Sequence, residues 1–479
     1  MAFLGGPLPG LRPARAWRPG CPSLPRPGGR VIALPDLEEE SRSPERLDRL
    51  PPRLLPVLYF AFGHLCLGLA FLALALTPET LAGFFYHSRI LAVVHLVTLG
   101  WISASILGAL YIIAPMAFRM QMPARRLDYA AFTLFVIGVM GMVSHFWLNT
   151  YDGMVWSALT VIAGLGIFTA RLAPVLWAAK LPSAIKLHIG FALFNILLAG
   201  VLGALLGVEK LMIHVLPGHQ LTNVYAHAHL AALGWATMMV IGAGYRLFPM
   251  FLPAAMPSGR RLYVSALLLQ VGALGLFATL MLQSRWVALF TALTIAGLFA
   301  FGAQLVWMTR HPRPAPKALQ KPDFGMLHNM QALAYLGLSV LLGLALVIAP
   351  PLEWKLRAAA AYGVLGLVGF LSQMVVGMSA RLWPMFSWTH SFVGSGFAVP
   401  PPTPHVMPDR RLQAVTFLLW VGCVPLLAAG LYFPDMTLVR VSAWGLFLAV
   451  IAETLNSARV LRFAFGYRKK SQIDIRDGG

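Results

Sequence analysis

The chain has 479 residues, of which 58% are hydrophobic and only 11% are charged. Apolar runs of about twenty residues, the length of a membrane-spanning helix, recur along it. This composition excludes an ordinary soluble domain. The formal net charge of +20 comes mainly from loops and tails, so we attribute it to contact with anionic lipid and predict no nucleic-acid binding. The chain is therefore predicted to be an all-α polytopic membrane protein in a lipid bilayer.

The first segment, residues 1–53, is rich in Pro, Gly and Arg and has no apolar periodicity. This composition predicts a disordered leader, although a misplaced start codon would produce the same pattern. The segment has no apolar core followed by a cleavage site, which argues against a secretory signal.

About twelve spans follow the leader, because each crossing of a bilayer needs about 20 apolar residues. We group them into three pseudo-symmetric four-helix modules, at about 54–180, 186–309 and 326–462, within a membrane domain of 54–463. A basic tail follows at 464–479. The predicted spans are roughly 54–76, 89–116, 129–148, 154–179, 186–207, 222–250, 262–283, 287–309, 326–349, 358–387, 412–432 and 438–462.

The loops between these spans alternate in charge. Clusters such as Arg125 with Arg126, or Lys317 with Lys321, follow every second span, whereas residues 77–86 contain no Lys or Arg. Positively charged loops mark the cytoplasmic side of a membrane protein. We therefore predict a protein of the cytoplasmic (inner) membrane with both termini in the cytoplasm.

One segment of the chain occurs three times. His95–Met116 recurs 134 residues later as His229–Met250, with the His, two Gly, Trp, Tyr and the Pro-Met end retained. A third copy, 135 residues further on, covers Gly369–Phe386, but Val364 occupies the position of the His. This repeat is the reason for predicting three modules.

The repeated histidines lie at one depth if the orientation is correct. A rise of ~1.5 Å per residue puts His95 about 10 Å into the membrane from the outer side, and His227 and His229 at a similar level. His227 and His229 are two residues apart on one helix, so they should point to nearly opposite faces. Ionisable groups in a membrane are costly and tend to mark sites, and neutral imidazole commonly binds haem iron and copper. His95, His227 and His229 are therefore the candidate ligands, and simple interhelical hydrogen bonding is the alternative.

Other histidines are weaker candidates. For His145 and His64 we expect structural roles, and we interpret His188 and His328 as interfacial residues at helix starts. Six more histidines are assigned to loops: His87, His214, His219, His311, His390 and His405.

Sulfur-containing residues give no metal signature. The cysteines are far apart, and the absence of Cys-x-x-Cys-His excludes a covalently attached c-type haem by that motif. Methionine is a soft copper ligand. In so apolar a chain, however, we expect the methionine side chains only to fill space between the helices. The methionines considered are Met116, Met238, Met239, Met250, Met374, Met378 and Met385.

The topology, the repeat and the segment Tyr225–Trp235, which reads Tyr-Ala-His-Ala-His-Leu-Ala-Ala-Leu-Gly-Trp, resemble subunit I of the haem-copper oxidase superfamily. That superfamily includes cytochrome c oxidases and nitric oxide reductases, and NnrS-type proteins are a looser match. The resemblance implies that His95 matches a low-spin haem ligand on the second helix. It also implies that His227 and His229 lie where the sixth helix carries a copper ligand.

The chain departs from that family in two helices. The family has paired histidines on its seventh helix and a His-x-His on its tenth, but residues 262–283 and 358–387 contain no His. The family's His-Pro-Glu-Val-Tyr type motif is also absent, and Glu453 is the only carboxylate well inside a predicted span.

Taken together, the resemblance and these losses imply a divergent member of the haem-copper oxidase superfamily. Such a member lacks the full copper–haem oxygen-reducing centre. It would bind a b-type haem, with copper as a second candidate cofactor, and act in electron transfer or small-gas (O2 or NO) handling. A cytochrome c or another redox subunit is the expected partner, and whether the protein is an oxidoreductase stays open. The alternatives are a membrane transporter and a cofactor-handling or scaffold subunit without redox activity.

Overall fold

The computed structural model describes residues 50–81, 83–211, 214–350, 353–396 and 400–466. Nearly all of the predicted leader (1–53) and basic tail (464–479) lies outside these residues. Within these residues the regular secondary structure is all helical, apart from an isolated β-bridge between Ala254 and Pro312.

Twelve helices in the described part are long and apolar enough to cross a membrane. This finding confirms the predicted all-α fold and the number of spans, and it implies a lipid bilayer as the surroundings. Nine spans are single helices: α3 (Leu54–Leu76), α7 (Arg126–Leu148), α8 (Met154–Ala178), α9 (Ser183–Glu209), α12 (Arg261–Met281), α13 (Val287–Arg310), α14 (Phe324–Ile348), α17 (Arg410–Tyr432) and α18 (Met436–Gly466).

The other three spans are the second, sixth and tenth, and each contains a π-helical stretch. They consist of α5 (Ser88–His95), η1 (Leu96–Ser103) and α6 (Ala104–Met116); α10 (Gln220–His229), η2 (Leu230–Thr237) and α11 (Met238–Phe251); and α15 (Trp354–Gly363), η3 (Val364–Ser372) and α16 (Gln373–Gly394). The π-helix is rare, and where it interrupts an α-helix it is frequently at a functional site. The first two stretches start directly after His95 and His229, and the third starts at Val364, the residue that matches these histidines in the sequence repeat, so the three starts agree to within one residue.

Two glycines in each copy of the repeat let the preceding span come close. At the first glycine, a Cβ atom would lie within 3.0 Å of a side chain on that span, so only glycine permits the observed approach. The pairs are Gly100 with Cys66 of α3, Gly234 with Asn195 of α9, and Gly369 with Tyr335 of α14. The second glycines pack in the same way: Gly108 on Tyr59, Gly242 on His188, and Gly377 on the backbone of Gly325.

Local sequence signals fix several helix ends. The carboxylates of Asp323 and Asp409 accept hydrogen bonds from backbone amides of the first turns of α14 and α17, which is the usual role of an N-cap aspartate. Helix α7 ends at Asn149, whose φ of 58° is the left-handed conformation common at helix ends.

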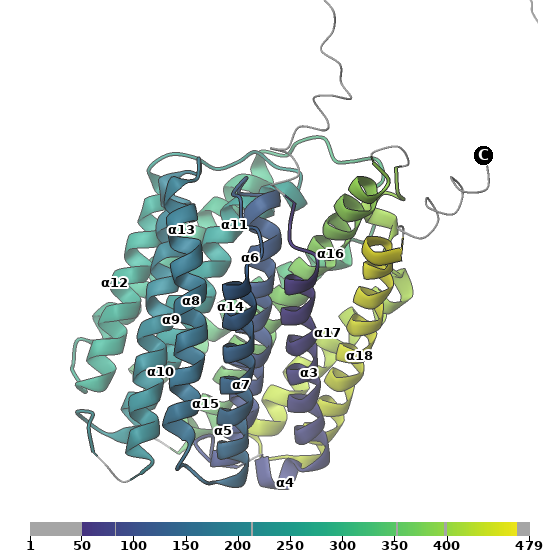
Figure 1. The fold of residues 1–479 in the computed structure, drawn as a ribbon. Coiled ribbons are helices and arrows are strands. Elements are labelled where there is room, and N and C mark those ends of the chain that lie inside the picture. Colours follow the sequence, from purple (N-terminus) through teal and green to yellow (C-terminus); the bar gives the residue numbers. More distant parts are fainter. Residues whose placement is uncertain (1–49, 82, 212–213, 351–352, 397–399, 467–479) are drawn as a thin grey trace, which may run out of the picture. The chain divides into compact units, whose positions relative to one another are not determined.

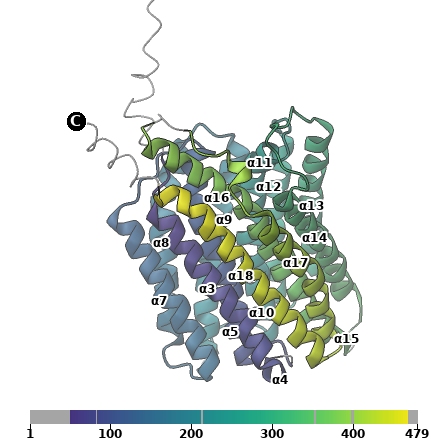
Figure 2. The same cartoon turned by 90° about the vertical axis from the view of Figure 1, so that its right-hand side faces the viewer.

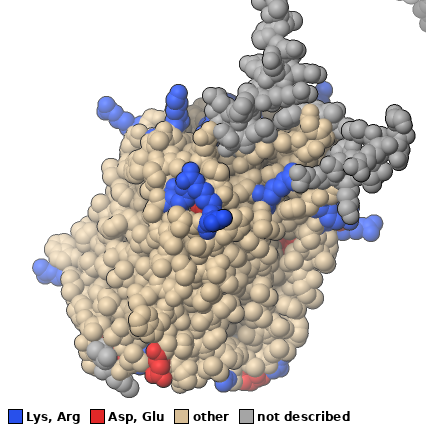
Figure 3. All heavy atoms as spheres, in the orientation of Figure 1, with Lys and Arg blue, Asp and Glu red and all other residues tan. Residues whose placement is uncertain are grey.

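Charged side chains are concentrated at the ends of the helices, and the sides are apolar. Large apolar side chains such as Trp156 and Phe299, each 72% exposed, project from the sides, where acyl chains would cover them. Figure 3 shows most of the visible Lys and Arg toward its upper end, which we call the basic end. Figures 1 and 2 place α11 and α16 toward this end and α5, α10 and α15 toward the opposite one.

The tenth span is longer than predicted. It runs from Trp354 to Gly394, whereas the sequence predicts 358–387 with Pro384 near its cytoplasmic end. Pro384 instead lies inside α16. The assignment of His390 to a loop is therefore wrong: it is a buried helical residue that accepts a hydrogen bond from Arg53 Nε at 3.3 Å.

Candidate functional site

The three π-helical stretches meet in the interior of the helical bundle. Both η1 and η2 contact η3, and the buried Trp235 Nε1 of η2 donates a hydrogen bond to Ser103 Oγ of η1 at 3.0 Å. The candidate histidines lie at or next to the ends of these stretches. The repeat therefore brings the π-helical stretches and the candidate histidines to one region of the bundle.

His95 is the last residue of α5, and its ring is half-buried. Its Nδ1 donates to the backbone carbonyl of Leu91 at 2.7 Å, because a carbonyl oxygen can only accept. The Nε2 atom is then an unprotonated acceptor, the state in which imidazole binds a metal. The described residues provide no hydrogen bond to this Nε2, and the ring stacks on Phe146 with centroids 5.0 Å apart.

His229 repeats this arrangement on α10. Its Nδ1 donates to the carbonyl of Tyr225 at 2.8 Å, so its Nε2 is also an acceptor. Here Nε2 has a partner: the hydroxyl of Tyr362 donates to it at 3.3 Å, and the two rings are stacked at 5.8 Å. Tyr362 lies on α15, two residues before Val364. The third copy thus supplies a tyrosine next to the histidine of the second copy.

His227 faces different neighbours from His229, in agreement with the prediction that the two point to different sides of α10. Its ring packs on Gly203 of α9, where a Cβ atom would come within 3.0 Å of Cε1. Its Nδ1 is buried and has no hydrogen-bond partner in the described part of the chain. The structure therefore pairs His229 with Tyr362, and it leaves a buried nitrogen of His227 without a partner among the described residues.

The weaker candidates have mainly local contacts. His145 Nδ1 contacts the carbonyl of Thr150 at 3.0 Å, in the turn that ends α7. His64 is buried on α3, where its Nδ1 bonds Phe60 O at 2.8 Å and its ring meets Trp101 edge-on. The Nε2 of His64 has no partner among the described residues, which the sequence gave no reason to expect.

His188 and His328 are buried, so their interpretation as interfacial residues is wrong. His188 is 0% exposed, and its Nε2 lies 3.0 Å from Ser265 Oγ. His328 is 2% exposed, and its Nδ1 lies 3.3 Å from Gln373 Nε2. Both histidines lie on spans that pack against a repeat helix, which removes them from lipid and water.

A buried acidic group was missed by the sequence reasoning. Asp128 is 0% exposed in the first turn of α7, just outside the predicted span of 129–148. It accepts hydrogen bonds from Tyr111 Oη at 2.9 Å and from Arg171 Nε at 3.3 Å. The Tyr in each of the first two repeat copies was a signal, because a buried phenol needs a polar partner.

An aromatic cluster lies over the non-basic end of the site. The ammonium of Lys210, just after α9, lies 4.0 Å from the ring centre of Tyr86 and 5.6 Å from that of Tyr151. Burial lowers the pKa of Lys210, and burial together with the nearby Tyr151 and Glu209 raises the pKa of Tyr86 to about 12. Phe85 stacks on Tyr225 one turn before His229. The loop before α5 thus reaches α10 through Phe85.

Within the described ranges, three or more His, Cys, Asp or Glu side chains nowhere gather as they would to hold a metal ion. A cofactor held by only two imidazoles, such as a six-coordinate haem, needs no such group. No protein-family model matches the chain, and a search of curated proteins gives no match either.

Proposed function

We propose that this protein is a membrane haem protein of electron transfer or small-gas handling, and that His95 and His227 are its haem ligands. The observation that carries the proposal is the state of the two imidazoles: Nδ1 of His95 is engaged by a carbonyl, which leaves Nε2 as a free acceptor, and His227 has a buried nitrogen without a partner among the described residues. An unsatisfied polar atom in an apolar interior is costly, and a metal bond would satisfy it.

The donor set suits a b-type haem. Two neutral imidazoles are common axial ligands of haem iron, and the chain lacks the Cys motif for covalent attachment. Bound there, the haem would supply a one-electron redox couple. The protein's own contribution is to fix tautomers: the Leu91 carbonyl keeps the proton of His95 on Nδ1, which leaves Nε2 free to bind.

The proposal includes three modules in the manner of haem-copper oxidases, with the basic end in the cytoplasm. The recurring π-helices and glycine contacts support the modules, and the distribution of Lys and Arg supports the orientation. The third module has Val364 and Tyr362 where the family has haem ligands. We therefore propose electron transfer or gas binding without the oxygen-reducing centre, and we assign no copper to the histidines.

The test is a reduced-minus-oxidised absorbance spectrum of the purified full-length protein and its variants. We expect a b-type haem band in the wild type, and its loss or severe reduction in His95→Ala and in His227→Ala. His145→Ala is the matched control, because this imidazole contacts Thr150 and Gly153 in the connection between α7 and α8, and it should keep the band. A protein that folds but carries no haem would contradict the proposal and favour a transporter or scaffold.

A further inference from the structure

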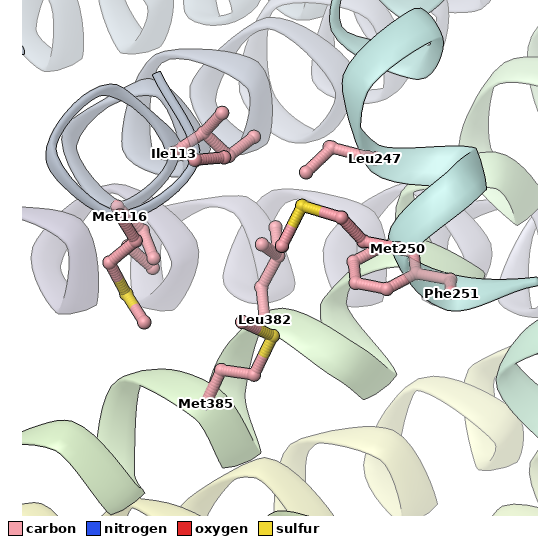
Figure 4. Close-up of a pocket in the computed structure, with 9 residues that line it drawn as sticks. Ile113, Met116, Leu247, Met250, Phe251, Leu382 and Met385 are labelled. Carbon is pink, nitrogen blue, oxygen red and sulfur yellow. The ribbon is translucent and has the colours of Figure 1, made fainter. Parts of the chain in front are cut away.

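The basic end of the bundle has a small cavity lined by the same position of all three repeat copies. Met116, Met250 and Met385 end the repeated segments on α6, α11 and α16, and all three line this cavity. Figure 4 shows Met250 and Met385 extending from α11 and α16 into the space between the helices, with Met116 reaching it from α6. Methionines from three helices thus line one cavity.

The rest of the lining is apolar. One helical turn before each methionine lies an aliphatic residue, Ile113, Leu247 or Leu382, and the remaining lining residues are also apolar. The cavity volume is about 10 Å³, which is the room that one water molecule needs. A water there would find no oxygen or nitrogen side chain to bond, so a species that prefers sulfur fits better.

We propose that Met116, Met250 and Met385 bind one Cu(I) ion through their three sulfur atoms. Thioethers are soft ligands and select Cu(I), whereas Zn(II), Mg(II) and Ca(II) prefer nitrogen, oxygen or thiolate ligands that this cavity lacks. The alternative is that the three methionines only fill space. Two features distinguish them from other methionines of the described chain: they occupy equivalent positions in the repeat, and they line the same ion-sized cavity.

The nearby guanidinium of Arg246 opposes the binding of any cation, but it opposes a monovalent ion less than a divalent one. Arg246, one turn before Met250, donates from Nε to the carbonyl of Ala117 at 3.1 Å and has no carboxylate partner in the described part of the chain. A divalent ion would feel twice the repulsion from this guanidinium. The equivalent Arg381 pairs with Asp323. Met250 is 38% exposed, so an ion can enter from the basic end.

The site is independent of the proposed haem. Its ligands lie at the basic ends of the spans, whereas His95 and His227 lie toward the opposite end of theirs. A Cu(I) ion at the methionines would therefore bind whether or not the histidines hold haem.

The experiment measures Cu(I) bound to the purified full-length protein in detergent, by competition with a coloured Cu(I) chelator, with X-ray absorption to identify the ligand atoms. We expect one sulfur-coordinated Cu(I) per chain. Replacing any one of the three methionines by Leu should weaken binding at least about tenfold, since even indirect partners of metal ligands have effects of that size. The triple variant should lose the ion.

Met239→Leu and Met374→Leu are matched controls, because both residues are buried on the same helices, α11 and α16, and do not line the cavity. Exchange of Met for Leu conserves volume and is usually tolerated in a core, so the variants should fold; a circular dichroism spectrum checks this. Unchanged affinity in the triple variant, a spectrum with only nitrogen or oxygen ligands, or equally tight Zn(II) binding would overturn the proposal. Retention of Cu(I) by His95→Ala separates this site from the haem.

Discussion

Removing the carboxylate of Asp128 should destabilise the protein more than any change at a surface ion pair. Asp128 is 0% exposed, and it bonds the buried Tyr111 hydroxyl at 2.9 Å, the Arg125 amide at 2.7 Å and the Arg171 guanidinium at 3.3 Å. In Asp128→Ala all three donors lose this acceptor at once. The matched control is Glu79→Ala, whose partner is Arg440, because both side chains of that pair are about half exposed.

The expected loss follows from burial. Deleting one partner of a buried ion pair costs about 3–5 kcal/mol, because the other charge stays without compensation. The Arg171 side chain is 18% exposed, which moderates its share, but the 0% exposed Tyr111 hydroxyl adds about 1–3 kcal/mol when it is left without a partner. We therefore expect Asp128→Ala to lose about 3–5 kcal/mol, and Glu79→Ala about 0–1 kcal/mol.

The assay is the free energy of unfolding in detergent micelles, followed by tryptophan fluorescence, for the wild type and both variants. Asp128→Asn separates charge from shape, and it should lose less than Asp128→Ala, because its amide oxygen still accepts the Tyr111 hydrogen bond. If Asp128→Ala is no less stable than Glu79→Ala, the buried network contributes nothing and the argument from burial is wrong.

Three further predictions concern packing, pH and topology. Gly377→Ala should cost about 1–3 kcal/mol of unfolding free energy, because its Cβ would clash with the Asn329 side chain and would lie 2.8 Å from the Gly325 carbonyl, whereas Gly337→Ala, with nothing within 4 Å, should be neutral or stabilising. Backbone amides that bond Asp409 lower its pKa, so its contribution to stability is present at neutral pH and lost as pH falls below about 4; Asp409→Asn should lack this part of the acid-induced fall in melting temperature. A single cysteine introduced at Lys317 should react with an impermeant thiol reagent only from the cytoplasmic side, and one at Asp435 only from outside; the reverse would refute the orientation.

The number and position of the spans could be predicted from the sequence, because length and apolarity set a membrane helix almost alone. The length of the tenth span was underestimated. Pro384 suggested that the helix ends nearby, but helix α16 continues to Gly394. Prolines are tolerated inside membrane helices when neighbours satisfy the freed carbonyl. Local sequence cannot show this, because the neighbours come from other spans.

The candidate site was predictable only in part. Spacing alone predicted that His227 and His229 point to different sides, but their partners, Gly203 and Tyr362, come from other helices. Nothing in the sequence showed that His229 meets Tyr362. The π-helical stretches were also invisible, because their residues resemble those of any apolar helix.

Electron paramagnetic resonance of the oxidised, purified protein tests the central claim most directly, because the spectrum of ferric haem reports its axial ligands. A haem held by His95 and His227 would give the low-spin signal of two imidazoles, which His227→Ala would convert to a high-spin signal or abolish. A protein without haem, or a low-spin signal that is the same in the wild type, His95→Ala and His227→Ala, would contradict the assignment.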